Sequence, residues 1–346
     1  MPFTITVLPK GLSFTARADE TLLAAAEKAG FAFRHSCDAG SCQICEGVLR
    51  QGTVLLKHNK ALIKHTDLQA NSLLFCLAVP TTDCVIEAQN VLAPGELPVI
   101  TAACQVHKVH PLNDEVTEVF LKLPAGKKIE YYPGQYLEIL LGDDACAFSI
   151  ANAPTPTNNI ERLIELHIRN QNDSPLAIAI AKKLVVGEMV KIALPKGSCV
   201  LPDSIISGTP SEPIIFLAGS TGFSPVKAML EACFNANNSA PLYLYWGGRQ
   251  AKDFYLHDLA LRWAEQYPNF TYVPVVSEPE NSPEWQGRTG FVHHAVLADF
   301  NNTLDTAFVI GGGSPGMVWA AHDDFIKAGM KPENMISDVF AYAPRD

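Results

Sequence analysis

The spacing of apolar and polar residues changes twice along the chain, and these changes predict three regions of different structure. In the first region, residues 3–7 and 12–16 alternate apolar and polar positions on either side of a turn that contains proline and glycine, which predicts a β-hairpin. Residues 21–29 follow with leucine and alanine gathered on one side, so we expect a helix that Asp19 caps and Gly30 ends.

Two shorter strand-like segments, residues 47–49 and 84–88, complete this first region. A hairpin, a helix and closing strands are the elements of a β-grasp fold, which we expect over residues 1–92. Residues 92–98 contain two prolines and a glycine and have little apolar surface to bury, so they predict a linker.

The second region, residues 99–208, consists of short strand-like segments with turn signals at close intervals. Six short strands within about a hundred residues predict an antiparallel β-barrel. One helix is expected among them over residues 175–184, with Ser174 as its N-cap. The strand candidates are residues 102–109, 116–123, 135–141, 147–150, 164–168 and 189–193.

The third region, residues 211–346, replaces alternation with continuous apolar strands that are separated by helical stretches. This pattern predicts a doubly wound parallel α/β domain, so the whole chain combines α+β and α/β domains. Ligands in such a sheet bind at the carboxyl ends of the strands. The strand candidates are residues 214–217, 242–245, 272–276, 307–310 and 336–339, and the helix candidates are residues 225–234, 256–266 and 315–328.

Composition and charge narrow the classes of partner. The chain is 48% hydrophobic and 18% charged and carries a net charge of −10, which excludes a nucleic-acid-binding protein because phosphate binding needs a basic face. Residues 1–92 hold eight basic and eight acidic residues, so the excess negative charge lies in the other two regions. Apolar runs such as residues 73–79 are far shorter than a membrane span, and the N-terminus lacks a basic segment before an apolar one. We therefore expect a cytoplasmic protein without a membrane partner.

Four cysteines show the spacing of a plant-type [2Fe–2S] ferredoxin. Cys37, Cys42 and Cys45 are separated by four and two residues, and Cys76 follows after thirty more. Gly40 lies among small residues that allow the loop to wrap around a cluster. Zinc sites usually pair two Cys-x2-Cys motifs and no second one is present, while disulfides fit poorly with nine cysteines and no signal peptide. We predict these four residues as the metal ligands.

The other cysteines are expected to be buried and inert. Cys84, Cys104, Cys199 and Cys233 lie in apolar or strand-like surroundings, where cysteine usually acts as a small hydrophobic residue. Cys146 lies in a segment with a different role, which is described below.

Two glycine-rich turns follow strands of the third region. The first strand runs into Ala-Gly-Ser-Thr-Gly at residues 218–222 and then into a helix, and residues 311–313 form a second turn after the fourth strand. Glycines allow a backbone to approach a pyrophosphate, and the start of a helix presents free N–H groups to it. This setting indicates a nucleotide site.

The order of these motifs resembles the ferredoxin–NAD(P)H reductase superfamily with an N-terminal ferredoxin domain. The resemblance rests on the cysteine loop, on Phe-Ser-Ile-Ala-Asn at residues 148–152 of the barrel, and on Ala-Gly-x-Thr-Gly-x-x-Pro at residues 218–225. Within the superfamily the chain is similar to reductases that act on CDP-6-deoxy-glucoseen sugars and to reductases of bacterial multicomponent oxygenases. The resemblance implies a [2Fe–2S] cluster, FAD, NADH or NADPH, and a separate electron-acceptor protein.

The resemblance also implies roles for residues of the barrel. Phe148 is expected against the flavin ring, and the Ser149 hydroxyl near flavin N5, where it would be catalytic. Tyr136 belongs to a second barrel signature. His167 and Arg169 match a strand whose arginine lies near the flavin phosphate. Ser174 falls where the family contacts the pyrophosphate at a helix start.

In the third region, the resemblance places the nicotinamide nucleotide against Gly219, Thr221 and Gly222, and against Gly313 of the second turn. Phe340 matches a terminal aromatic that covers the flavin and is expected to be catalytic together with Ser149.

Three positions depart from the family pattern. Cys146 stands where the flavin motif has arginine, Gly312 stands where the family has cysteine near the nicotinamide, and Gln43 stands where ferredoxins have glycine. The first change removes a bidentate phosphate ligand, and the second removes a thiol beside the hydride path. Arg249, after the second strand, is a candidate contact for a 2′-phosphate, so the choice between NADH and NADPH stays open.

Two functions follow from these observations. The first is an NAD(P)H-dependent reductase, in which a flavin mediates between a two-electron nicotinamide donor and a one-electron cluster that serves a partner such as a sugar dehydrase or an oxygenase. The second is a catalytically impaired iron–sulfur binding or scaffolding subunit with weak or lost flavin, which the substitutions at Cys146 and Gly312 would explain.

Overall fold

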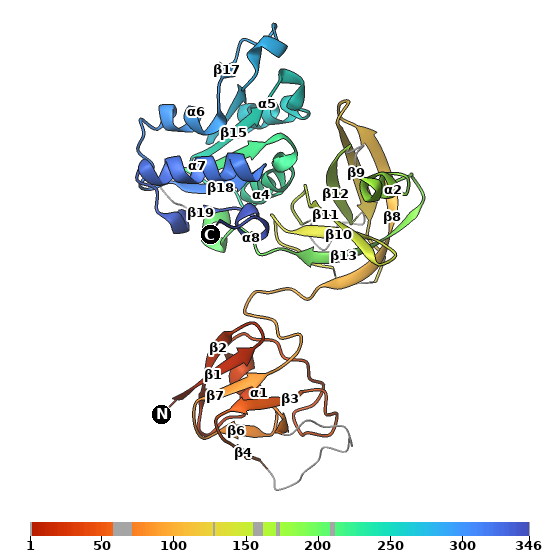
Figure 1. Ribbon diagram of the computed structural model, residues 1–346, viewed down its shortest axis with the longest axis vertical. Coiled ribbons are helices and arrows are strands. Elements are labelled where there is room, and N and C mark those ends of the chain that lie inside the picture. Colours follow the sequence, from red (N-terminus) through yellow and green to blue (C-terminus); the bar gives the residue numbers. More distant parts are fainter. Residues whose placement is uncertain are drawn as a thin grey trace. The chain divides into compact units, whose positions relative to one another are not determined.

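The computed structural model describes residues 2–57, 71–126, 129–154, 162–170, 174–207 and 212–345. The chain divides into two compact units, Met1–Pro98 and Val99–Asp346 (Figure 1). The second unit contains both the barrel and the α/β region, and each has a hydrophobic core of its own.

The first unit is built on a five-stranded sheet in the order β2-β1-β7-β3-β5. Strand β1 (Pro2–Leu8) pairs antiparallel with β2 (Leu12–Arg17) and parallel with β7 (Cys84–Glu87). Strand β3 (Glu46–Gln51) lies between β7 and β5 (Ser72–Leu74). Alternate residues of β1, such as Ile5 and Val7, are buried, as the two-residue pattern predicts.

Helix α1 (Leu22–Lys28) packs its leucines and alanines into the same core. Thr21, not Asp19, is the N-cap, because its side chain accepts a hydrogen bond from the Ala24 N–H at 3.2 Å. Asp19 instead pairs with Arg17. Strands β4 (Val54–Leu56) and β6 (Ala78–Pro80) form a separate two-stranded sheet. The sequence pattern did not predict them, since three residues are too few to show a period.

The barrel is a six-stranded antiparallel sheet in the order β11-β10-β13-β8-β9-β12 (Figure 1). A bridge between Ile150 and Leu166 joins the two edges and closes it. The strands are β8 (Ile100–Pro111), β9 (Val116–Lys122), β10 (Tyr136–Leu141), β11 (Asp144–Ser149), β12 (Leu163–Arg169) and β13 (Met189–Lys196), and all six were predicted. Helix α2 (Pro175–Ala181) begins at Ser174, whose hydroxyl accepts the Ala177 N–H at 3.3 Å, so the predicted cap is confirmed.

The α/β region has a parallel sheet in the order β17-β16-β15-β14-β18-β19. The chain order reverses between β14 (Ile214–Gly219) and β18 (Phe308–Gly312), which is the switch point where such sheets bind ligands. The remaining strands are β15 (Leu242–Gly248), β16 (Phe270–Val276), β17 (Arg288–Thr289) and β19 (Met335–Ile336). The last strand ends before Val339, which the sequence pattern had included; Val339 begins the short helix α8 (Val339–Tyr342).

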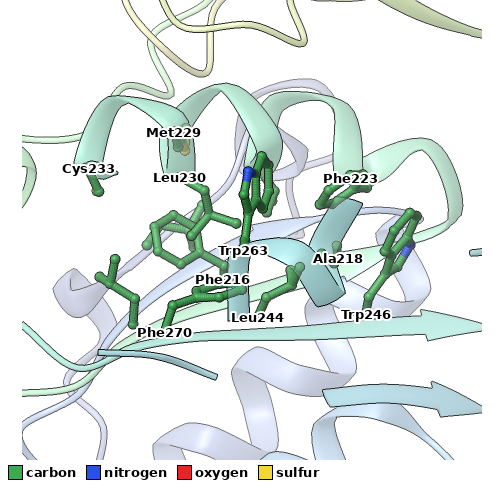
Figure 2. Close-up of a cluster of buried hydrophobic side chains, with 14 of the residues drawn as sticks. Phe216, Ala218, Phe223, Met229, Leu230, Cys233, Leu244, Trp246, Trp263 and Phe270 are labelled. Atoms are coloured by element: carbon green, nitrogen blue, oxygen red, sulfur yellow. The ribbon is translucent and has the colours of Figure 1, made fainter. Parts of the chain in front are cut away.

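Helices cover both faces of this sheet. One core contains α4 (Phe223–Asn235) and α5 (His257–Gln266), and the other contains α6 (Val292–Asp299), which was not predicted, and α7 (Pro315–Lys327). Successive residues of β14 alternate between the two cores, which explains its continuous apolar sequence. Figure 2 shows the first core, where the rings of Phe223 and Trp246 stack with centroids 4.0 Å apart. Phe223 begins α4, so this stack fixes the start of the helix that follows the glycine turn.

Short helices complete the second unit. The segments are α3 (Asp203–Ile206), η1 (Ser220–Gly222), η2 (Ala251–Asp253), η3 (Pro279–Asn281) and η4 (Pro332–Asn334). Among the described residues, no helix is both long enough and apolar enough to cross a membrane.

Candidate functional site

The loop between α1 and β3 and the turn between β5 and β6 bring the predicted metal ligands together in two pairs. The sulfur atoms of Cys37 and Cys42 lie 3.2 Å apart, and Cys45, at the end of the loop, lies beside Cys76 of the turn, where both are buried. Gly40 has a φ of +76°, and a Cβ atom there would come within 2.6 Å of Leu77. Two pairs of thiols in a loop that requires glycine fit a [2Fe–2S] cluster, in which each iron takes two cysteine ligands.

The surroundings of the sulfur atoms differ between the pairs. Hydrogen bonds from the Ser41 hydroxyl and from the backbone N–H groups of Cys42 and Ala39 lower the pKa of Cys37 to about 6. Burial, together with the neighbouring Cys45, raises the pKa of Cys76 to about 12. Cys37 is therefore prepared as a thiolate, whereas Cys76 would have to lose a proton in order to serve as a metal ligand.

Gln43 occupies a backbone conformation that favours glycine. Its φ is +60°, in the left-handed region, so the glycine of the family pattern is replaced here by a residue with a Cβ atom in an unfavourable geometry.

A cavity of about 720 Å³ in the second unit gathers most of the predicted flavin residues. Phe148, Ser149 and Cys146 line it from β11, and His167 and Arg169 line it from β12. These strands meet at the bridge that closes the barrel, which explains why residues about twenty positions apart reach one cavity. An aromatic ring, a hydroxyl and cationic side chains suit a flavin and its phosphates, so the lining fits FAD.

Lys182 lines the same cavity from the end of α2, and the sequence interpretation missed it. A lone lysine after a helix gives no local signal, but its position supplies a positive charge in the cavity where Cys146 replaces the arginine of the family. Burial and the charge of Asp144 raise the pKa of the Cys146 thiol, so this residue stays protonated.

A second cavity, also of about 720 Å³, lies at the carboxyl ends of the parallel strands. Gly219, Gly248, Arg249 and Ser314 are among the residues that line it. This is the switch point of the sheet, and small residues leave its wall open for an extended ligand, so the lining fits a nicotinamide nucleotide.

The turn at residues 219–222 separates the two cavities. Thr221 lines the first cavity, whereas Gly219 and Ser220 line the second, and Arg169 lines both. Ser220 has a φ of +50°, and its carbonyl oxygen accepts a hydrogen bond from the indole N–H of Trp246 at 3.3 Å. The turn is therefore held in one conformation between the two sites.

Gly222 packs against the second glycine turn and lines neither cavity. A Cβ atom at Gly222 would lie 2.3 Å from the backbone of Gly312, so this glycine is needed for contact between the turns. Gly313 has a φ of +153° and lies near Met317 and Gly219. The predicted nucleotide contacts of Gly222 and Gly313 stay predictions.

Three other predicted residues do not line either cavity. Tyr136 pairs with Ser149 across β10 and β11, and the hydroxyl of Ser174 serves as a helix cap. The ring of Phe340 packs on Trp319, with centroids 4.7 Å apart, and on His322. Their roles toward the flavin remain predictions.

The remaining cysteines behave as expected, with one exception. Cys84, Cys104 and Cys233 are buried, while Cys199 is only partly buried. Burial raises the pKa of Cys104, Cys199 and Cys233 to about 12, so these thiols are unreactive.

Comparison with known proteins agrees with this geometry. Residues 5–81 match the 2Fe-2S iron-sulfur cluster binding domain, and residues 216–323 match the oxidoreductase NAD-binding domain. Together with the flavin-type cavity of the barrel, these matches define the class as an NAD(P)H-dependent iron–sulfur flavoprotein reductase, which transfers electrons through FAD and a [2Fe–2S] cluster.

The chain belongs to the ferredoxin–NAD(P)H reductase family with a 2Fe–2S domain, as the resemblance predicted. It is 32% identical over 340 residues to the CDP-6-deoxy-L-threo-D-glycero-4-hexulose-3-dehydrase reductase of Yersinia pestis, covering 98% of this chain and 99% of that protein. It is 34% identical to protein RfbI of Salmonella typhimurium, covering 98% and 97%. The reductase component DmpP of a Pseudomonas phenol 2-monooxygenase is 28% identical, covering 93% and 89%.

A solved structure supports the fold over nearly the whole chain. The Amycolatopsis cytochrome P450 reductase GcoB superposes with a TM-score of 0.65 at 23% identity, covering 97% of this chain and 98% of that one. The predicted fold class is therefore confirmed.

Proposed function

We propose that FAD occupies the first cavity and NAD(P)H the second, and that electrons leave through a cluster on Cys37, Cys42, Cys45 and Cys76 to a separate protein. The observation that carries this proposal is the turn at residues 219–222, whose two sides line the two cavities. When bound, FAD supplies the exchange between donor and cluster, since it accepts two electrons as a hydride and releases them one at a time.

The barrel residues orient and hold the flavin. The ring of Phe148 offers a surface for stacking, and the Ser149 hydroxyl offers a hydrogen bond toward the reacting edge of the flavin. Arg169 and Lys182 supply positive charge for the phosphates, and Arg169 is oriented by Glu115, whose Oε2 lies 2.7 Å away.

The acceptor we propose is a dehydrase of the type served by the hexulose dehydrase reductases. Relatives of that name are 32% identical over 98% of this chain, whereas the phenol and terephthalate reductase components are 28% identical. We also propose that the protein is cytoplasmic, which fits an acceptor of this type and a nicotinamide donor.

Spectroscopy of the purified protein tests the electron path. FAD and cluster absorption should both be present, and NADH or NADPH should bleach the flavin first and then the cluster. In Cys42→Ser the flavin should still be bleached, but the cluster and reduction of a one-electron protein acceptor such as cytochrome c should be lost. Cys104→Ser, at a buried cysteine away from the loop, should behave as wild type. A cluster spectrum without flavin, even after FAD is added, would support the scaffolding alternative instead.

A direct comparison tests the acceptor. Electron transfer from the reduced protein to a purified hexulose-3-dehydrase should be faster than transfer to a phenol monooxygenase at equal concentrations. The reverse order would contradict the dehydrase assignment without affecting the electron path.

A further inference from the structure

Helix α4, which starts directly after the glycine turn, contacts the last residue of β11 and the segment that follows it through three side chains on one face. The Ser224 hydroxyl donates to the Ser149 carbonyl oxygen at 3.1 Å, and the Lys227 ammonium donates to the Ala151 carbonyl oxygen at 3.1 Å. The Glu231 carboxylate accepts from the Ala153 N–H at 3.0 Å. The three side chains are three, four and seven positions apart, which places them in a row along the helix.

The row therefore joins alternate residues 149, 151 and 153 to one rigid helix. Ser149 faces the flavin cavity, and the turn that precedes α4 separates that cavity from the nucleotide cavity. The contacts fix the distance between the strand that carries Ser149 and the turn that carries Gly219 and Thr221.

Lys227 is the centre of a buried ionic network. Its Nζ atom lies 2.8 Å from Glu165 Oε2 and 2.6 Å from Glu231 Oε1, and its side chain is only 6% exposed. The other Glu165 oxygen accepts from His167 Nε2 at 2.8 Å, and His167 Nδ1 lies 3.1 Å from the Tyr255 hydroxyl. Every polar group of this network has a partner, which is the condition for a buried ion pair to be tolerated.

Lys227 keeps its positive charge because it contacts two carboxylates. Burial would lower the pKa of Lys227, but the charges of Glu165 and Glu231 outweigh it and raise that pKa. Glu118, Glu165 and His167 are close enough together to suit a metal ion. The Lys227 ammonium already holds the Glu165 carboxylate, however, so the network is a polar anchor and not a metal site.

We propose that Lys227 is a positioning residue for hydride transfer, which holds the flavin-facing strand at a fixed distance from the nucleotide turn. This inference rests on the proposed function. Hydride transfer is sensitive to the distance and orientation of the reacting atoms, and a displacement of about 1 Å can cost on the order of 100-fold in rate. Lys227 contacts neither cavity, so its removal should change the geometry between the two ligands more than the affinity for either one.

The test uses Lys227→Met in the full chain loaded with FAD. The rate of flavin reduction at saturating NADH or NADPH, measured by stopped flow, should fall by about 10-fold to 100-fold. The dissociation constants of FAD and of the nucleotide should change by less than about threefold, because no cavity-lining group is removed.

Asn238→Ala is the matched control. Asn238 is also buried and holds the chain after α4 by hydrogen bonds to the Ile205 and Ile206 carbonyl oxygens, at 2.6 and 3.1 Å, but it does not contact residues 149–153. It should lower thermal stability with little change in the saturating rate. Equal rate losses in the two variants would overturn the positioning role and leave Lys227 as a structural residue only.

Lys227→Met leaves the Glu165 carboxylate without its ammonium partner, so the single variant can fail to fold. The double variant Lys227→Met/Glu165→Gln removes that unpaired charge as well and keeps the test valid in this case. The double variant should regain stability and remain slow; a return to the wild-type rate would overturn the proposal. In the FAD-free protein, hydrogen exchange at the Ala153 amide should be faster in the single and in the double Lys227 variant than in the wild type. Unchanged exchange in these variants would also contradict the positioning role. If NAD(P)H does not reduce the flavin of the wild type, the proposed function fails, which the exchange measurement distinguishes from failure of this inference.

Discussion

Gly222 and Gly312 lie so close that a Cβ atom on Gly222 would come within 2.3 Å of the Gly312 backbone. The reverse contact is equally tight, since a Cβ atom on Gly312 would lie 2.4 Å from the Gly222 carbonyl oxygen. The carboxyl ends of β14 and β18 are thus held together backbone against backbone, and the two glycine turns form one structural unit at the switch point of the sheet.

Gly222→Ala is therefore expected to destabilise the second unit by about 1–3 kcal/mol, because the methyl group can be accommodated only if one backbone moves. Urea unfolding followed by tryptophan fluorescence measures this loss. Gly316→Ala is the control: it lies in α7 with no atom within 4 Å of its Cβ position, and should stabilise by up to about 1 kcal/mol through helix propensity. Equal stability of wild type and Gly222→Ala would show that the turns are not packed as described.

The sequence predicted features whose signals are local. The four cluster cysteines, the six barrel strands and the Ser174 cap all depend on the spacing of neighbouring residues. The predicted cap at Asp19 was wrong because Thr21 also offers a side-chain oxygen that can accept a hydrogen bond, and only the geometry at Ala24 decides between them. Lys182 and Lys227 were missed for another reason.

Lys227 and Glu165 are 62 residues apart, so nothing in the local sequence of either one indicates their pairing. A weak signal was present in β12, where Glu165 and His167 interrupt an otherwise apolar segment at positions two apart. Polar residues in a fully buried strand require partners, but the sequence does not say from which element these come.

Two positions with positive φ in the loop between α1 and β3 give a pair of predictions about the cluster. Gly40→Ala should impair cluster assembly, because the added Cβ atom would meet Leu77 at 2.6 Å and would occupy a left-handed conformation. Gln43→Gly should keep the cluster and stabilise it slightly, by up to about 1 kcal/mol, since glycine relieves the left-handed strain. Iron and acid-labile sulfide per protein, before and after incubation at raised temperature, measure both effects. Better cluster retention in Gly40→Ala than in Gln43→Gly would contradict the loop geometry.

The lining of the flavin cavity predicts that substitutions at two positions change the affinity for FAD in opposite directions. Cys146→Arg should bind FAD about one to two decades more tightly, because a charge-assisted hydrogen bond contributes roughly 1.5–3 kcal/mol. Lys182→Ala should weaken FAD binding, since it removes a cation from the cavity lining. Titration of FAD into flavin-free protein gives the dissociation constants, with Lys183→Ala as the neighbouring control outside the lining. Tight wild-type binding with no gain from arginine would mean that Lys182 already replaces the missing contact.

The position of Arg249 predicts that this side chain favours NADPH over NADH. It lines the second cavity at the end of β15, where a 2′-phosphate would lie if the nucleotide binds as proposed. Arg249→Ala should raise the KM for NADPH at least tenfold more than the KM for NADH, through loss of a charged contact of roughly 1.5–3 kcal/mol. Initial rates with both donors provide the comparison, and an equal change in the two KM values would exclude the phosphate contact.

The buried network predicts how stability depends on pH. Burial is the largest single influence on Glu165 and would raise its pKa, but the hydrogen bond from His167 and the charge of Lys227 together lower it below the ordinary 4.5. The same pairing raises the pKa of Lys227 above its ordinary 10.5. Glu231, Glu118, Tyr255 and Tyr131 also face this network. Burial raises the pKa of both tyrosines, so their hydroxyl groups stay protonated.

The stabilisation from Glu165 is therefore fully present above pH 4.5 and is lost as the pH falls through the lowered pKa of the folded protein. That from Lys227 is present below pH 10.5 and is lost as the pH rises through its raised pKa. Glu165→Gln should lower the free energy of unfolding by roughly 3–5 kcal/mol at neutral pH, because it leaves the buried Lys227 ammonium with one counter-ion fewer.

This cost should shrink steadily as the pH is lowered below 4.5, since the wild type then loses the same charge. Urea unfolding of the flavin-free protein at a series of pH values between neutral and the acid transition measures the difference. Glu333→Gln, at an exposed position of the same unit, should stay within about 0.5 kcal/mol of wild type throughout. A cost for Glu165→Gln that is the same at acidic and neutral pH would show that Glu165 is not ionised in the folded protein, and that Glu231 balances the charge of Lys227 in this pairing.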